Sequence, residues 1–84
     1  MLPDAGTHYN PDPANARGLI ERIQAAGKSQ RWIAERLGVT DRRIRYLIAG
    51  ERIVNGDTLA VTMSYTEQFA LECLADAADV LRLE

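Results

Sequence analysis

Hydrophobic positions recur at helical spacing in three consecutive stretches, each of which starts after a capping residue and ends near a glycine. The capping residues are Asp12, which precedes Pro13, then Ser29 and Thr40, and the glycines are Gly27, Gly38 and Gly50. The inward positions are Ala16, Leu19, Ile20 and Ile23, then Ile33, Ala34 and Leu37, then Ile44, Leu47 and Ile48. This pattern predicts three short helices.

The segments around these helices carry different signals. Residues 1–11 are rich in Pro, Asp, Gly and Asn, which predicts a flexible arm or loop. Residues 51–65 leave two alternatives open: a short hairpin or extended arm, favoured by the Asn55-Gly56 pair, or an irregular loop. A last helix is predicted over 66–83, with Thr66 as its cap. We therefore expect a single all-α domain over 1–84 with four to five helices, with or without that hairpin.

Residues 30–49 follow the pattern of a helix-turn-helix, in which two helices are joined by a tight turn. Ala34 supplies the small side chain needed where the helices cross, and Gly38 supplies a residue that tolerates positive φ at the turn. Val39 fills the gap between the helices. These features predict a small Cro/repressor-like domain whose second helix enters the DNA major groove.

The inward stripe of the predicted helix at 41–49 determines which residues face the DNA. The expected base-reading residues are Asp41, Arg42, Arg45 and Tyr46. Contacts to the DNA backbone are expected from Gln30, Arg31, Arg43 and Trp32. Two alternatives stay open: the arginines form an ordinary solvated face paired with acids, and Trp32 packs against the first helix or the arm.

The charge distribution supports a local basic surface on an acidic chain. The net charge is −2, but residues 17–52 hold nine basic against four acidic residues, whereas residues 53–84 hold one against six. A basic middle segment can bind phosphates although the whole chain is acidic.

Other classes of protein find little support in the sequence. No apolar run approaches the roughly 20 residues that span a membrane, and no secretory leader is recognisable. The single cysteine, Cys73, excludes an internal disulfide framework, and we expect a cytoplasmic protein. The single histidine, His8, is expected to be a solvated arm residue and makes no metal or nucleophile site with Cys73. We therefore expect no enzyme activity, metal, cofactor or small-molecule ligand.

The last predicted helix is apolar on more than one face, which indicates that one face packs on the domain and another on a second subunit. The expected dimer interface consists of Phe69, Leu71, Leu74, Ala78 and Leu81. Cys73 is expected to be a buried small hydrophobe on this helix. In a twofold dimer the recognition helices would lie about 34 Å apart.

Several patches of sequence together resemble the anti-CRISPR-associated repressors of phages and other mobile elements, and the first of these families in particular. The patches are Pro11-Asp12-Pro13, Arg17-Gly18-Leu19, Ser29-Gln30-Arg31, Ala34-Glu35, Leu37-Gly38, Asp41-Arg42, Arg45-Tyr46 and the run from Tyr65 to Ala75. The resemblance implies a homodimer that binds inverted repeats in the promoter of an anti-CRISPR operon and represses it, including its own gene. It also implies that Arg31 and Arg42 are DNA-contacting arginines. The chain departs from the family at Trp32, where relatives have a basic residue, and over 51–64.

Two other functions remain alternatives on sequence grounds. An antitoxin-type protein would use the same motif for DNA and its last helix for a toxin partner. A protein-interaction module would share the helical shape without binding DNA, and the arginine cluster argues against it.

Overall fold

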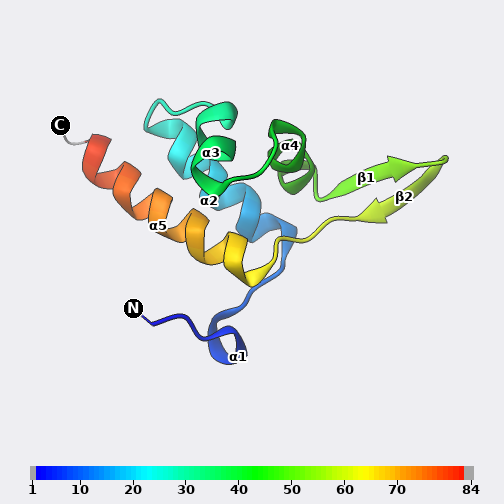
Figure 1. Cartoon of the computed structure of the whole chain (residues 1–84), viewed down its shortest axis with the longest axis horizontal. Helices are drawn as coiled ribbons and strands as arrows, with labels where there is room; N and C mark the ends of the chain where they lie inside the picture. Colours follow the sequence, from blue (N-terminus) through cyan, green and yellow to red (C-terminus); the bar gives the residue numbers. More distant parts are fainter. Residues whose placement is uncertain (1, 83–84) are drawn as a thin grey trace.

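The computed structural model describes residues 2–82, which form five helices and two short strands (Figure 1). In chain order these are α1 (Ala5–His8), α2 (Pro13–Ala25), α3 (Gln30–Leu37), α4 (Asp41–Ala49), β1 (Glu51–Val54), β2 (Asp57–Ala60) and α5 (Tyr65–Arg82). Helices α2, α3 and α4 match the three stretches predicted from hydrophobic spacing. The side chains of Asp12, Ser29 and Thr40 each accept a hydrogen bond from a backbone N–H in the first turn, as expected of capping residues.

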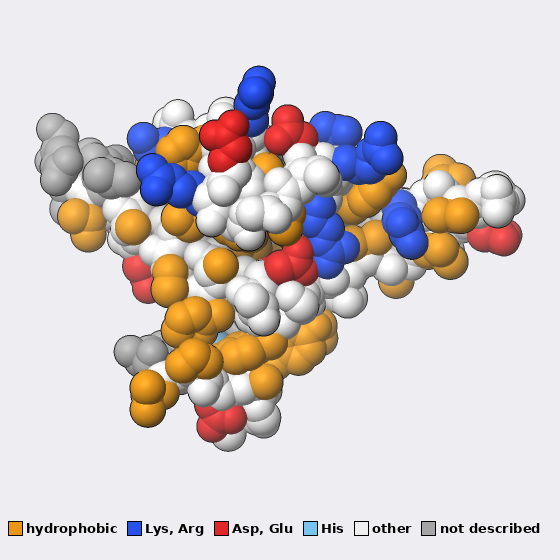
Figure 2. Space-filling model, viewed as in Figure 1, with side chains coloured by type: hydrophobic (Ala, Val, Ile, Leu, Met, Phe, Trp, Pro, Cys, Tyr) orange, Lys and Arg blue, Asp and Glu red, His pale blue; other side chains and the backbone are white. Residues whose placement is uncertain are grey.

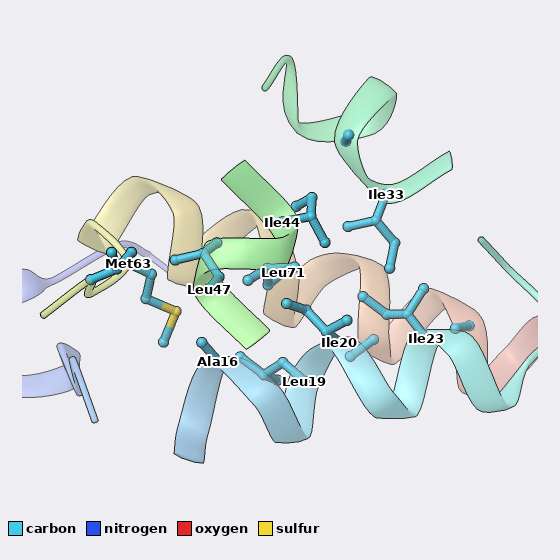
Figure 3. Packing of buried hydrophobic residues seen from close by; sticks show 13 residues of the cluster. Ala16, Leu19, Ile20, Ile23, Ile33, Ile44, Leu47, Met63 and Leu71 are labelled. Atoms are coloured by element: carbon cyan, nitrogen blue, oxygen red, sulfur yellow. The ribbon is translucent and has the colours of Figure 1, made fainter. Parts of the chain in front are cut away.

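The core lies where α2 meets α3, α4 and α5 (Figure 3). Ile20 and Ile23 of α2 are fully buried and point toward Ile33 of α3 and Ile44 of α4. Full burial of an aliphatic side chain of this size stabilises a fold by roughly 1.5–3 kcal/mol relative to exposure. These contacts therefore fix the positions of α3 and α4 on the rest of the molecule.

The connection between α3 and α4 is a tight turn of three residues. Gly38 ends α3 in the left-handed conformation, with φ of 74°, which glycine adopts without a Cβ penalty. The backbone N–H of Val39 then donates to the carbonyl of Ala34 at 3.0 Å, and Val39 packs against the core. Ala34 is itself buried, so the helices approach closely at a small residue, as predicted.

Strands β1 and β2 form an antiparallel hairpin that extends away from the helices (Figure 1). Asn55 and Gly56 form its turn with φ of 52° and 82°, the positive values that a two-residue hairpin turn requires. Every residue of both strands is exposed. Of the two alternatives for this segment the hairpin is the one that forms, and the fold is mostly helical rather than purely α.

Helix α5 begins one residue before the predicted start, and its cap differs from the prediction. Ser64 Oγ accepts from the Glu67 N–H at 3.1 Å, while a Glu67 carboxylate oxygen accepts from the Ser64 N–H at 2.8 Å. This reciprocal pair is a capping box, so Ser64 rather than Thr66 caps the helix. The predicted end at Leu83 lies outside the described residues.

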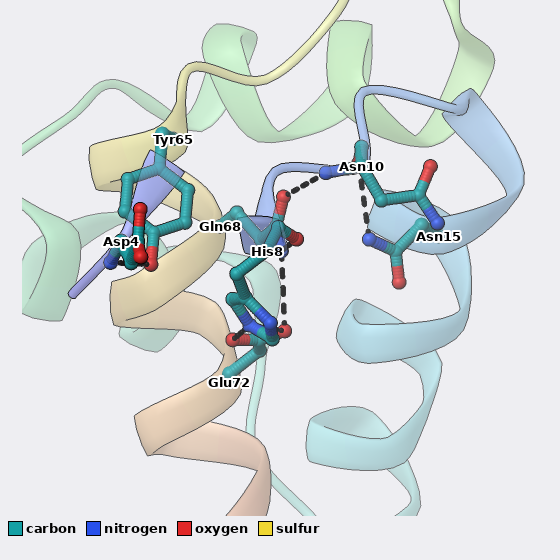
Figure 4. Close-up of polar contacts among 7 residues, drawn as sticks. All are labelled: Asp4, His8, Asn10, Asn15, Tyr65, Gln68 and Glu72. Carbon is teal, nitrogen blue, oxygen red and sulfur yellow. Dashed lines mark hydrogen bonds and ion pairs between the residues drawn. The ribbon is translucent and has the colours of Figure 1, made fainter. Parts of the chain in front are cut away.

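The N-terminal arm is packed, whereas the sequence predicted a flexible segment over 1–11. Helix α1 and the residues after it lie against α5 (Figure 4). The buried side chain of Gln68 accepts from the Asn10 N–H at 2.7 Å and donates to the His8 carbonyl at 3.0 Å. The His8 ring lies 2.6 Å from a carboxylate oxygen of Glu72, so His8 is not the solvated residue that we expected. Long-range hydrogen bonds thus override a local composition that favours loops.

Candidate nucleic-acid interface

Helix α4 turns its apolar side to the core and its charged side to solvent. Ile44 and Leu47 lie on the inner side of the helix, and at most 1% of the surface of either residue is exposed. The exposed residues on the outer side are Asp41, Arg42 and Arg45. Tyr46, also predicted to read bases, is half-buried and packs against the core. Three of the four predicted base-reading residues are therefore fully presented to solvent, and the fourth presents part of its side chain.

Arg43 differs from its neighbours because its guanidinium is held by other parts of the chain. Its Nε and one terminal nitrogen donate to the two carboxylate oxygens of Glu67 at 2.9 and 2.7 Å. The terminal nitrogen also donates to the Thr62 carbonyl at 3.0 Å. This fork raises the pKa of Arg43 and, through the same hydrogen bonds, lowers the pKa of the Glu67 carboxyl below its usual 4.5. Arg43, which we predicted to contact the DNA backbone, joins α4 to the start of α5 through these bonds.

The first turn of α3 presents the two residues predicted to position the DNA backbone. Gln30 is half-buried and Arg31 is exposed. The Nε of Arg31 lies 3.3 Å from a carboxylate oxygen of Glu35, one helical turn further along. Because both side chains are mostly in solvent, such a pair contributes little to stability, and Arg31 can exchange this partner for a phosphate.

Trp32 belongs to the packed surface rather than to the exposed face of α3. Its ring is half-buried and lies against the core cluster. The Lys28 ammonium lies 5.2 Å and the Arg36 guanidinium 5.1 Å from the ring centroid, within the range of cation–π contacts. Of the two alternatives for Trp32 this arrangement favours packing. The ring thus contacts one positive side chain from before α3 and one from its last turn.

A small hollow lies between α4 and β1, and it brings in a residue that sequence reasoning missed. The hollow has a volume of about 220 Å³. It is lined by Thr40, Arg42, Arg43, Tyr46 and Arg52, and we call it the basic hollow. Arg52 stands three residues after the end of α4, and only the hairpin brings its side chain to this helix. The Asn-Gly turn signal, combined with strand register, was the available clue.

Positive side chains gather over α4 and the base of the hairpin (Figure 2). Within residues 2–82, no hydrogen bond or ion pair engages the guanidinium of Arg42, Arg45 or Arg52. Their charges are therefore directed to solvent and available to an anionic partner.

The residues predicted to form a dimer interface on α5 do not share one surface. Leu71 and Ala78 are fully buried in the core of a single chain, so neither can contact a second copy, and this part of the prediction is wrong. Phe69 and Leu74 are half-buried, and the side chain of Leu81 lies outside the described residues. Cys73, expected to be buried, is exposed.

An apolar groove beside the arm includes Phe69, one of the residues predicted to form the dimer interface. The groove has a volume of about 260 Å³ and is lined by Pro3, Tyr65, Thr66, Phe69 and Ala70. Leu2, which precedes Pro3 in the sequence, is 89% exposed. Figure 2 shows hydrophobic side chains gathered over the arm and the adjoining part of α5.

A larger hollow of about 650 Å³ lies between the arm, α2 and α5, and both acidic and basic side chains line it. His8 faces Glu72, and the Arg22 guanidinium lies 3.3 Å from Asp76 and 2.6 Å from Asp79. This hollow therefore lacks the excess of positive charge that characterises the basic hollow.

No family model and no curated protein sequence matches this chain. None of the helices between residues 2 and 82 has the length and apolar character needed to cross a lipid bilayer.

Proposed function

We propose that this chain is a sequence-specific DNA-binding repressor in which α3 and α4 form a helix-turn-helix and α4 is the recognition helix. One observation carries the proposal: Arg42 and Arg45 are both exposed, three residues apart, on a helix whose other side is fixed in the core. A fixed helix with two free arginines fits bidentate recognition of guanine in the major groove.

The neighbouring residues take supporting roles in this proposal. Arg31 and Gln30, at the start of α3, contact the sugar-phosphate backbone and set the orientation of the protein on the duplex. Asp41 and Tyr46 flank the two arginines and limit which bases they accept. Arg43 acts indirectly, because its ion pair with Glu67 joins the recognition helix to α5.

The proposed repressor acts as a homodimer on inverted repeats. The apolar groove at Phe69 supports this, since a surface lined by Pro3, Tyr65 and Ala70 is better covered by protein than left in water. The resemblance to anti-CRISPR-associated repressors supports a promoter target within an anti-CRISPR operon that includes the protein's own gene. Repression then follows from occupancy of that promoter.

The test is titration of the purified protein against the DNA upstream of its own gene and against a scrambled duplex, at two salt concentrations. We expect tight, salt-dependent binding of two subunits to the upstream DNA only. Arg42→Ala and Arg45→Ala should each weaken specific binding by about 1–3 kcal/mol, roughly 5- to 150-fold, without loss of folding.

A matched control is Arg22→Ala, which removes one arginine that is paired with Asp76 and Asp79 against α5. It should leave DNA binding unchanged. Equal weak binding of both duplexes by the wild-type protein, or full affinity in both recognition-helix variants, would contradict the proposal.

A further inference from the structure

The basic hollow combines charge from two separate elements of the chain. Arg42 and Arg43 come from α4, and Arg52 comes from β1. No carboxylate is among the lining residues, and the remaining two, Thr40 and Tyr46, carry hydroxyl groups. Several guanidinium groups around a small space, without a carboxylate, form an environment that favours a phosphate.

The three arginines are not equally available to such a ligand. Arg43 already donates to both Glu67 oxygens and to the Thr62 carbonyl. Arg42 and Arg52 make no hydrogen bond to another residue within the described chain. The charge of Arg43 is therefore offset by Glu67, and Arg42 and Arg52 carry the free positive charges of the hollow.

The register of the hairpin directs Arg52 to the hollow and its acidic neighbour elsewhere. Arg52 pairs with Leu59, whereas Glu51 pairs with Ala60. Successive residues of a strand point to opposite faces, so Glu51 lies on the face away from Arg52. At the hairpin base, the Val61 N–H donates to the Gly50 carbonyl at 3.0 Å, which fixes the first residues of β1 relative to α4.

We propose that the basic hollow binds a phosphate of the DNA backbone, and that Arg52 makes this contact at the edge of the groove that α4 enters. The inference rests on the proposed function, and it adds the base of the hairpin to the DNA-binding surface. A contact of this kind adds affinity and fixes orientation but carries no sequence information. Arg52 therefore differs from Arg45, whose loss should alter sequence preference.

The test measures the affinity of Arg52→Ala for both the upstream and the scrambled duplex over a series of salt concentrations. We expect both affinities to fall by the same factor, so that their ratio is unchanged. The slope of log K against log salt should be smaller by about 0.9, the value for one lost phosphate contact. Arg52→Lys, which keeps the charge, should recover most of the slope, and Arg22→Ala should keep it entirely.

Different results identify different failures. If Arg52→Ala keeps the wild-type affinity and slope while Arg42→Ala weakens binding, the phosphate contact is wrong and the repressor proposal stands. If the wild-type protein does not distinguish the two duplexes but Arg52→Ala still lowers the slope on both, the contact stands and the repressor proposal fails. Inorganic phosphate could shift the Arg52 side-chain NMR signal while Arg52→Ala keeps the wild-type slope of log K against log salt for DNA. In that case the hollow binds a free anion and the inference is overturned.

Discussion

Glu67 takes part in two local structures at once. Its backbone N–H and carboxylate complete the capping box with Ser64. The same carboxylate accepts two hydrogen bonds from the Arg43 guanidinium. Only 13% of its side chain is exposed, so water screens these contacts weakly. The start of α5 and helix α4 are therefore held by one carboxylate.

The lowered pKa of Glu67 determines how this link depends on pH. The unfolded chain binds the proton more tightly than the folded chain, so the pair adds stability above the usual pKa of 4.5. That stability is lost as the pH falls through the lower pKa of the folded state. Helices α4 and α5 are thus joined throughout the neutral pH range.

Glu67→Gln tests this link, because it keeps the size of the side chain and removes its charge. We expect the variant to lose about 1.5–3 kcal/mol of unfolding free energy at pH 7, the range for hydrogen bonds to charged groups. The difference from wild type should shrink below pH 4.5, as the wild-type carboxyl becomes protonated. Urea unfolding across pH measures both effects. Glu21→Gln, at an exposed position of α2, is the control, and an equal loss there would contradict the assignment.

Sequence reasoning identified the arginine cluster but not which arginines are free. Arg42, Arg43 and Arg45 have the same chemistry, and helical spacing places Arg43 only to one side of the outer face. The distinction comes from Glu67, 24 residues away in the chain, which engages Arg43 alone. A partner at that separation becomes visible only when α4 and α5 are placed together.

At the scale of elements, α2, α3 and α4 were the most predictable, because each combines a side-chain cap with a regular apolar stripe. Asp12, Ser29 and Thr40 act within three residues, so the sequence contains both partners of each interaction. The start of α5 was missed although its capping box is also local, because Thr66 offered a competing cap. The hairpin stayed undecided because all residues of its two strands are exposed, so their pattern shows no buried face.

The junction between α4 and the hairpin depends on close contact between Gly50 and Pro13. Gly50 has φ of 76°, and a Cβ placed there would lie 2.9 Å from the Pro13 Cβ. Gly38 has nearly the same φ, 74°, but a Cβ there would meet nothing within 4 Å. The two glycines therefore share a backbone requirement and differ in their surroundings.

This pair gives a matched test of the contact. Gly38→Ala should lower the unfolding free energy by about 1–2 kcal/mol, the cost of a left-handed conformation for a residue with a Cβ. Gly50→Ala should incur that cost and a further 1–3 kcal/mol or so from overpacking against Pro13. Thermal or urea unfolding of both variants measures the difference. Equal losses would mean that α2 and α4 separate without cost, and that Pro13 does not fix the hairpin base.

At the scale of the whole molecule, polar contacts hold the N-terminal arm against α5. The long-range contacts of the arm reach α5 through Tyr65, Gln68 and Glu72, and none of these follows from local pattern. Only 1% of the surface of Gln68 is exposed, and both its side-chain oxygen and its side-chain nitrogen have hydrogen-bond partners (Figure 4). The arm in turn supplies Pro3 to the apolar groove that we propose for the second subunit.

Gln68→Leu should therefore release the arm while the helical core stays folded. The apolar replacement removes the hydrogen bonds to the Asn10 N–H and the His8 carbonyl, each of which contributes about 0.5–1.5 kcal/mol. Undocking lets water satisfy both groups, so we expect limited proteolysis within residues 1–11 to become much faster than in wild type.

Glu72→Gln is the control for this prediction, because it removes the charge opposite His8 but leaves both backbone contacts of Gln68 in place. It should keep the arm protected. If Gln68→Leu is cleaved as slowly as wild type, the buried amide does not hold the arm. If the wild-type arm is already cleaved as fast as an unfolded peptide, the arm is flexible, as its composition predicted, and the groove beside Phe69 lacks a fixed wall.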